Sequence, residues 1–117
     1  MTADKFGITN YAKASDSAEL QKMEELLAKD PDSVPLLEWI AFMYYTSDSY
    51  DRAVELYQKL VKLDSKNEAN HYYLANLYLK LKQKDRAVEH WNRVISLNPV
   101  SKFADKAKHL IDEHTRS

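Results

Sequence analysis

The four histidines are the side chains best suited to chemistry, because imidazole serves both as a general base and as a metal ligand. His109 and His114 are separated by five residues, which misses the four-residue spacing that lets two histidines share a metal ion on a helix face. His71 and His90 each lie alone in stretches with helical periodicity. The chain has no cysteine, and it lacks a glycine-rich phosphate loop and an H-E-x-x-H motif. We therefore expect no enzymatic activity, no catalytic residue, no metal and no cofactor.

A basic cluster is the second feature that could bind a ligand, and it consists of Lys80, Lys82, Lys84 and Arg86. Such a cluster is either a solvated turn, which we favour, or a contact for an acidic partner or an RNA backbone. The formal net charge of the chain is -1, whereas proteins dedicated to nucleic acid or anionic membrane favour basic surfaces. We expect neither nucleic acid nor membrane among the partners.

Length and composition indicate one small helical domain. The chain has 117 residues, 44% of them hydrophobic and 30% charged, with one glycine and three prolines. Because the chain has so few turn-forming residues, we expect long helices joined by short turns. Lack of cysteine suits a reducing compartment, and neither a signal peptide nor an apolar run of the ~18 residues that a membrane span needs is visible. The expected location is the cytoplasm.

An internal repeat organises the chain. The segment DRAVELYQKLVKLDS at 51–65 returns 34 residues later as DRAVEHWNRVISLNP at 85–99. In each copy an alanine is followed four residues later by an aromatic residue, Ala53 by Tyr57 and Ala87 by Trp91, which places both on one helix face. A looser third copy precedes them, with Leu20 and Met23 aligned to the apolar positions. Repeats of this length predict an array of helix pairs.

The segments before the second and third copies complete a known pattern. They read Leu37-x2-Ile40-Ala41-x2-Tyr44 and His71-x2-Leu74-Ala75-x2-Tyr78. With the alanine and aromatic positions above, the chain resembles the tetratricopeptide repeat (TPR) family. The resemblance implies an all-α fold, a right-handed superhelix of antiparallel helix pairs with about two and a half repeats and a C-terminal capping helix.

The repeat pattern divides the chain into five parts. Residues 1–15 form an irregular segment or a decayed helix, 16–32 a half-repeat helix, 33–67 and 68–100 two TPR-like repeats, and 101–117 a capping helix and tail. The capping helix is predicted because Phe103, Ala107 and Leu110 share one face and charged residues occupy the other. Such a cap keeps the apolar end of a repeat array out of water.

The TPR resemblance also assigns a binding groove to the side chains that the repeat core leaves over. In TPR proteins the first helix of each pair lines a concave groove that binds peptides. The residues so assigned are Glu38, Phe42, Tyr45, Tyr72, Asn76, Leu79, Lys80 and Lys106. The alternative for the aromatic residues is packing between helices, which we favour for Trp39 and Tyr73. Exposed aromatic side chains are good peptide anchors because they bury much area with few rotors.

The N-terminal segment carries three apolar side chains in a polar context, Phe6, Ile8 and Tyr11. They either belong to a frayed tail or occupy the groove of the same or a neighbouring copy. Phe6 and Gly7 are also in phase with Ile40 and Ala41, the relation expected of a decayed first helix.

The sequence as a whole predicts a non-enzymatic protein-protein interaction module that binds a peptide or partner segment in an aromatic groove. The alternative is a self-associating structural unit that stacks through its end faces. Residues 1–67 carry 8 basic and 12 acidic side chains, and residues 68–117 carry 9 and 6. This asymmetry is either a property of solvated helix faces or a source of head-to-tail attraction between copies.

Overall fold

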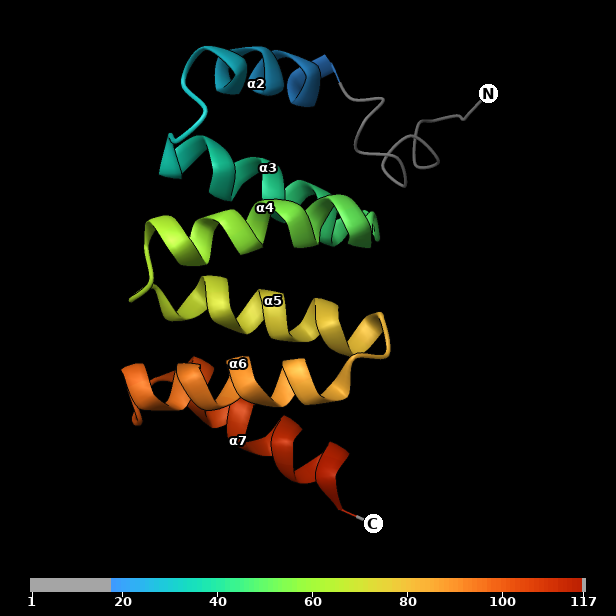
Figure 1. The fold of residues 1–117 in the computed structure, drawn as a ribbon, viewed down its shortest axis with the longest axis vertical. Coiled ribbons are helices and arrows are strands. Elements are labelled where there is room, and N and C mark those ends of the chain that lie inside the picture. The colour runs from blue at the N-terminus through green and yellow to red at the C-terminus, as the bar shows by residue number, and fades with distance from the viewer. Residues whose placement is uncertain (1–17, 117) are drawn as a thin grey trace.

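The chain folds as a stack of helices, and the computed structural model describes residues 18–116. Within this range there are six helices and no strand. Figure 1 shows them in chain order along the long axis, with α2 at one end and α7 at the other. The helices are α2 (Ala18–Lys29), α3 (Val34–Thr46), α4 (Tyr50–Leu63), α5 (Glu68–Lys80), α6 (Lys84–Leu97) and α7 (Lys102–Thr115). The predicted all-α fold of packed helix pairs is confirmed, and the handedness of the superhelix stays a prediction.

The helices begin where the sequence supplies capping side chains. Ser33 accepts a hydrogen bond from the Leu36 amide, Asn67 from the amides of Ala69 and Asn70, and Ser101 from that of Ala104. Each bond satisfies an amide that has no partner inside the helix. The predicted start of the first helix at residue 16 and the calls on Phe6, Gly7, Ile8 and Tyr11 lie outside the described residues.

The turns inside the two complete helix pairs repeat one backbone conformation. Asp48 and Lys82, 34 residues apart, have φ angles of 62° and 63°. At the second turn the Gln83 amide donates to the Tyr78 carbonyl at 2.8 Å, and the Lys82 amide donates to the Leu79 carbonyl at 3.0 Å. This is the Schellman arrangement that ends a helix with a left-handed residue. A side chain with a Cβ is disfavoured there.

Replacing Lys82 with glycine is therefore expected to stabilise the protein. Release of the left-handed strain outweighs the added chain entropy of glycine, so Lys82→Gly should raise the free energy of unfolding by about 0.5–1 kcal/mol. Urea unfolding followed by circular dichroism measures the change. The matched control is Glu89→Gly, at an exposed position inside α6, which should lower it by about 1 kcal/mol. A loss of stability in both variants would contradict the assignment.

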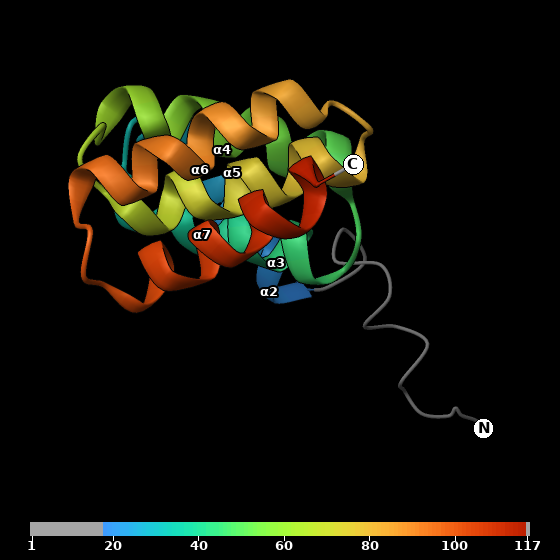
Figure 2. The ribbon, with the colours of Figure 1, turned by 90° about the horizontal axis from the view of Figure 1, so that it is seen from below.

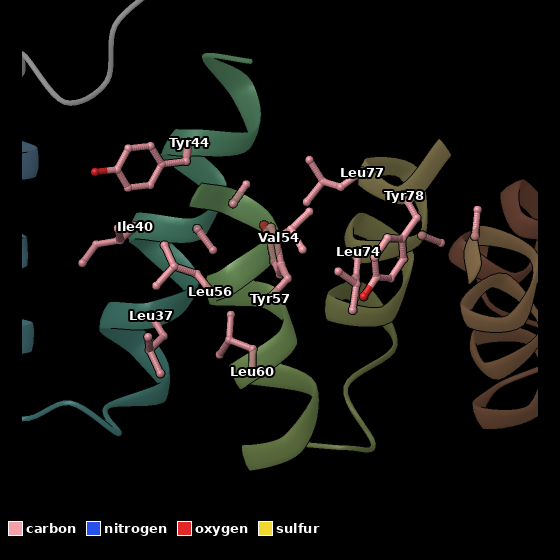
Figure 3. Close-up of a cluster of buried hydrophobic side chains, with 14 of the residues drawn as sticks. Leu37, Ile40, Tyr44, Val54, Leu56, Tyr57, Leu60, Leu74, Leu77 and Tyr78 are labelled. Atoms are coloured by element: carbon pink, nitrogen blue, oxygen red, sulfur yellow. The ribbon is translucent and has the colours of Figure 1, made fainter. Parts of the chain in front are cut away.

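The core lies between the helices and follows the repeat. The alanine and aromatic positions identified in the sequence are fully buried: Ala53 and Ala87 are 0% exposed, Tyr57 is 1% exposed and Trp91 is 0% exposed. Figure 3 shows the α4 side chains reaching toward both α3 and α5. The predicted core residues of α3 and α5 are likewise buried: Leu37, Ile40, Ala41, Tyr44, His71, Leu74, Ala75 and Tyr78.

Polar contacts repeat with the same offset as the core. The Tyr44 hydroxyl donates to Oε1 of Glu24 at 3.1 Å, which joins α3 to α2. One repeat later, Nε2 of Gln58 donates to the Tyr78 hydroxyl at 2.9 Å, which joins α4 to α5. Glu24 and Gln58 are 34 residues apart, as are Tyr44 and Tyr78. Helix α2 therefore packs on α3 as α4 packs on α5.

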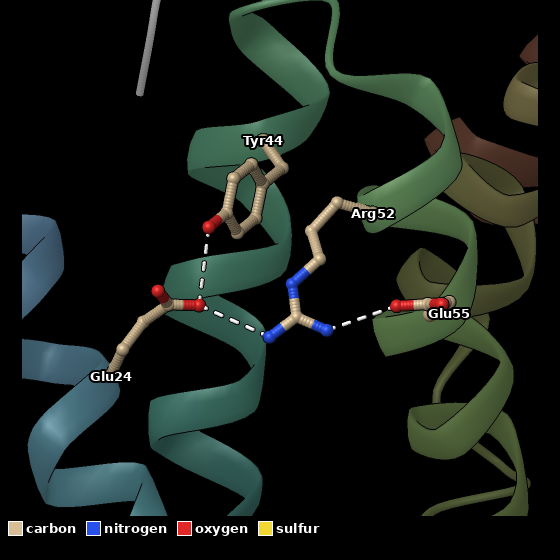
Figure 4. A network of polar contacts seen from close by, with 4 residues as sticks. All are labelled: Glu24, Tyr44, Arg52 and Glu55. Carbon is tan, nitrogen blue, oxygen red and sulfur yellow. Dashed lines mark hydrogen bonds and ion pairs between the residues drawn. The ribbon is translucent and has the colours of Figure 1, made fainter. Parts of the chain in front are cut away.

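An arginine extends the first of these contacts across three helices. Arg52 of α4 binds Glu24 of α2 at 3.2 Å and Glu55 of its own helix at 2.9 Å, as Figure 4 shows. Its guanidinium lies 5.7 Å from the centroid of the Tyr44 ring, the distance that also separates Arg86 from the Tyr78 ring. Exposed ion pairs of this kind contribute about 0–1 kcal/mol, so they fix the helix orientation more than they stabilise the fold.

Candidate peptide-binding surface

Aromatic side chains of α3, α5 and α7 form a continuous row. We call Phe42, Tyr45, Tyr72, Tyr73 and Phe103 the aromatic row. The ring centroid of Tyr73 lies 5.5 Å from Phe42, 5.0 Å from Tyr45, 5.6 Å from Tyr72 and 6.1 Å from Phe103. Figure 2 shows α4 and α6 on one side of the stack and α3 and α7 on the other. Rings at these separations attract one another beyond the area that they bury, so the row stabilises the alignment of the three helices.

The predicted groove residues differ in how far they reach solvent. Phe42 is 43% exposed, and its ring stacks on Tyr45 with centroids 6.1 Å apart. Tyr45 and Tyr72 are half-buried, as is Leu79, which packs against the core, while Lys80 is exposed at the last residue of α5. An exposed aromatic ring supported by other rings is a preformed apolar contact site.

A hollow of about 410 Å³ continues the aromatic row at its α7 end. Tyr72 lines it together with Lys106, and the other lining residues are Asp105, His109 and Leu110. Of the predicted groove residues, Tyr72 and Lys106 line this hollow, whereas Leu79 and Lys80 do not. Its lining combines the apolar surfaces of Tyr72 and Leu110 with one basic and one acidic side chain, Lys106 and Asp105.

Two of the predicted groove residues, Glu38 and Asn76, make hydrogen bonds between helices that the sequence pattern did not predict. Oε2 of Glu38 accepts hydrogen bonds from Nδ2 of Asn67 at 3.0 Å and from Nδ2 of Asn70 at 3.3 Å. These bonds connect α3 to the start of α5. The Glu38 carboxylate is therefore engaged within the protein, and removing either partner would leave a partly buried charge less satisfied.

Asn76 is likewise held from two sides. Its Nδ2 donates to the Tyr45 hydroxyl at 3.1 Å, and its Oδ1 accepts from the Trp91 indole at 3.0 Å. The amide thus links the aromatic row to the buried Trp91 of α6. Its role is to position Tyr45 rather than to offer a free amide to a ligand.

Burial keeps three tyrosines in and beside the aromatic row uncharged at physiological pH, namely Tyr45, Tyr57 and Tyr73. Burial is the main cause that raises the pKa of Tyr45 and of Tyr73 above the usual 10.0. Burial also raises the pKa of Tyr57, whose ring lies 5.7 Å from that of Tyr73. The surface therefore presents neutral rings and hydroxyl groups.

A histidine pair joins α5 to α6, and sequence reasoning did not find it. Nδ1 of His71 lies 3.1 Å from Nδ1 of His90, and Nε2 of His71 lies 2.9 Å from the Ser65 carbonyl. Because a carbonyl only accepts, His71 donates from Nε2, its Nδ1 accepts, and His90 donates from Nδ1. Burial is the main cause that lowers the pKa of both imidazoles below the usual 6.5. The neighbouring His71 lowers the pKa of His90 further, while the hydrogen bond to the Ser65 carbonyl partly offsets the effect of burial on His71.

Acidification is expected to destabilise the protein through this pair. As the pH falls from about 7.5 to about 5.5, the two histidines of the unfolded chain become protonated near their usual pKa. In the folded protein the lowered pKa keeps them neutral to a lower pH. The free energy of unfolding should therefore fall by up to about 1.4 kcal/mol per pH unit for each histidine that is protonated only in the unfolded chain. Urea unfolding at several pH values measures the slope. His90→Phe should flatten it between these limits, and an unchanged slope in that variant would refute the assignment.

The basic cluster lies at the turn between α5 and α6. Lys82, Lys84 and Arg86 line a small hollow together with Gln83 and Asp85 on the turn between α5 and α6, and Arg86 already packs on Tyr78. Among residues 18–116, no three histidine, aspartate or glutamate side chains are placed to hold a metal ion. In the same range no helix is long and apolar enough to cross a membrane.

Comparison with solved structures supports the same architecture. A chain in "Crystal structure of MamA protein" is 23% identical with a TM-score of 0.72, over 90% of this chain and 62% of that chain. A chain in "Crystal structure of MamA" is 21% identical with a TM-score of 0.73, over 93% of this chain and 66% of that chain. The chain thus spans less than two thirds of these TPR-containing proteins, and the likeness at this identity is one of fold.

Sequence comparison gives the family. No curated protein matches the sequence. The sequence model of the family described as anaphase-promoting complex, cyclosome, subunit 3 matches residues 10–94, which is most of the chain, and this family consists of TPR-type repeats. The chain therefore belongs to the anaphase-promoting complex subunit 3 family of tetratricopeptide repeat proteins.

Proposed function

We propose that the chain is a non-enzymatic interaction module that binds a peptide or a partner segment across α3, α5 and α7. The observation that carries the proposal is the aromatic row, in which five rings from three helices pack together while Phe42 stays 43% exposed. TPR-type repeats generally act in protein-protein interaction. The preferred ligand is apolar, and the cytoplasm stays the predicted location.

The proposed contacts follow from exposure and bonding. Phe42, Tyr45 and Tyr72 provide apolar contact, and Lys106 provides an exposed ammonium group beside Tyr72. Glu38 and Asn76 hold the helices in register through the bonds described above. Leu79 and Lys80 extend the surface toward the C-terminal end of α5. Packed aromatic side chains surrounded by contacts that contribute little binding energy are typical of binding hot spots.

Substitution of the exposed rings tests the proposal. Peptides selected by display against the full chain are titrated by calorimetry into the wild type, Phe42→Ala and Tyr72→Ala. Each substitution should weaken binding by about 10- to 100-fold, as expected for hot-spot residues. The matched control is Leu63→Ala on α4, because Leu63 is 42% exposed and lies outside the row. Equal losses in the control and in Phe42→Ala, or no loss at all, would refute the proposal.

Self-association through the end faces is the second candidate, and one observation favours it. Leu26 of α2, at one end of the stack, is 42% exposed. At the other end, α7 presents exposed charged side chains such as Asp105, Lys108 and Asp112, which oppose apolar stacking. Light scattering over a concentration series separates the candidates. A constant monomer mass supports the peptide-binding module, and a mass that grows with concentration supports assembly.

A further inference from the structure

The histidine pair occupies a position that the preceding helix pair fills with leucine. At the 34-residue offset His71 aligns with Leu37 and His90 with Leu56. Both leucines belong to the core, with 1% and 5% of their surface exposed, and His71 is 5% exposed. The fold therefore needs only apolar contact at this place. Imidazoles there are not required by the packing, and their burial costs desolvation free energy that leucine does not.

The two imidazoles face each other through the same ring nitrogen. Their Nδ1 atoms are 3.1 Å apart, while the ring centroids are 5.3 Å apart and the ring planes differ by 25°. Because the centroids are farther apart than the nitrogens, the Nδ1 atoms lie between the rings. Two imidazole nitrogens that share a tetrahedral ion at about 2.0–2.1 Å are separated by about 3.3 Å. The pair therefore needs little movement to hold such an ion.

One of the two rings is already oriented by the backbone. Nε2 of His71 donates to the carbonyl of Ser65, in the turn before α5, at 2.9 Å. This bond leaves Nδ1 of His71 with a lone pair directed at His90. Metal-binding histidines generally donate their other ring N–H to a carbonyl or carboxylate, which fixes the tautomer and the ring orientation. His71 is thus held in the state that a metal ion requires.

We propose that His71 and His90 bind one divalent transition-metal ion, Zn²⁺ or Cu²⁺, between their Nδ1 atoms and that the ion clamps α5 to α6. The ion replaces the hydrogen bond between the rings. The proton on Nδ1 of His90 moves to Nε2 of the same ring through water, so the imidazole stays neutral and no net proton is released. Water fills the remaining coordination positions beside His90, which is half-buried. The site lies outside the aromatic row and does not depend on the proposed function.

The charges around the pair set the expected affinity. The positive charge of Arg93 acts on His71. Arg86 and the acidic Glu89 act on His90. All three charged side chains are exposed, so salt screens the repulsion between the arginines and a cation. Two protein ligands are fewer than the three or four of usual zinc sites, so we expect weak binding. Cu²⁺ should bind more tightly than Zn²⁺, and Mg²⁺, which prefers oxygen ligands, should not bind.

Calorimetric titration of Zn²⁺ into the full chain at about pH 7.5 tests the site. The wild type should bind one ion at the pair, and the double variant His71→Leu with His90→Leu should weaken this binding at least about tenfold. That variant carries the residues of the preceding helix pair, so its fold should persist. The matched control removes the other two of the four histidines. His109→Gln with His114→Gln should keep the wild-type affinity.

Two further measurements keep the test independent of one variant. At about ten times its dissociation constant, Zn²⁺ should raise the melting temperature of the wild type by about 5 °C, and Mg²⁺ should not. Electron paramagnetic resonance of Cu²⁺ on the wild type should show coupling to two imidazole nitrogens. Equal Zn²⁺ affinity in the wild type and the leucine variant, or lost affinity in the glutamine control, would overturn the inference. So would a Cu²⁺ spectrum without two imidazoles, or a wild type that binds no ion.

Discussion

Trp91→Ala is expected to cause the largest loss of stability of any single substitution considered for this chain. Trp91 is 0% exposed and is among the largest fully buried side chains of the core. Its removal leaves a cavity between α6 and its neighbours, and such changes cost about 3–5 kcal/mol. It also leaves Oδ1 of Asn76 without the indole donor that lies at 3.0 Å, which adds to the loss.

Chemical denaturation followed by circular dichroism measures this loss, and the chain offers a matched control. Trp39 is the only other tryptophan and is half-buried on α3, so Trp39→Ala should lower the free energy of unfolding by less than half as much. Both variants lose one indole, so a general effect of tryptophan removal would appear in both. Equal losses in the two variants would contradict the burial of Trp91.

Tyr73→Ala is expected to have the second largest effect, because Tyr73 contacts rings of three other helices. Its centroid lies 5.0 Å from Tyr45 on α3, 5.7 Å from Tyr57 on α4 and 6.1 Å from Phe103 on α7. Loss of a half-buried ring with these contacts should lower the free energy of unfolding by about 2–3 kcal/mol. It should also weaken binding of a selected peptide, because Phe42 loses a supporting ring.

Tyr73→Phe separates the ring from the hydroxyl group. Among the described residues, the Tyr73 hydroxyl makes no hydrogen bond with another side chain or the backbone. Tyr73→Phe should therefore change the free energy of unfolding by less than about 0.5 kcal/mol and leave peptide affinity unchanged. If Tyr73→Phe is as damaging as Tyr73→Ala, the stabilising contact belongs to the hydroxyl and the role given to the row is wrong.

The sequence predicted the helices from their local periodicity and the core residues from the 34-residue repeat. The 34-residue offset aligned Ala53 with Ala87 and Tyr57 with Trp91, and a side chain that recurs at the same turn of equivalent helices is buried by equivalent neighbours. The favoured interpretation of Tyr73 as a residue packed between helices is also consistent with its ring contacts. The repeat predicted to begin at residue 33 starts at the Ser33 cap of α3, and such a cap is a local signal.

The polar contacts could not be predicted in the same way, because they join residues of neighbouring repeats. Asn70 and Glu38 are 32 residues apart, and Asn76 and Tyr45 are 31 apart. These separations differ slightly from the repeat length, so an alignment at 34 does not pair them. The contact between His71 and His90, which are 19 apart, joins the two helices of one repeat, and it has no counterpart in the preceding repeat, where the aligned residues are Leu37 and Leu56. A polar side chain at a position where the aligned repeat is apolar, such as Asn70 aligned with Leu36 and Asn76 aligned with Phe42, is the signal that would have pointed to such contacts.

The central claim is that the aromatic row on α3, α5 and α7 binds the ligand, and amide chemical-shift mapping tests it most directly. The full chain, labelled with nitrogen-15, is titrated with a display-selected peptide. The account predicts that the largest shifts fall on residues around Phe42, Tyr72 and Lys106. Largest shifts on the exposed residues of α4 and α6, with those three regions unaffected, would contradict it.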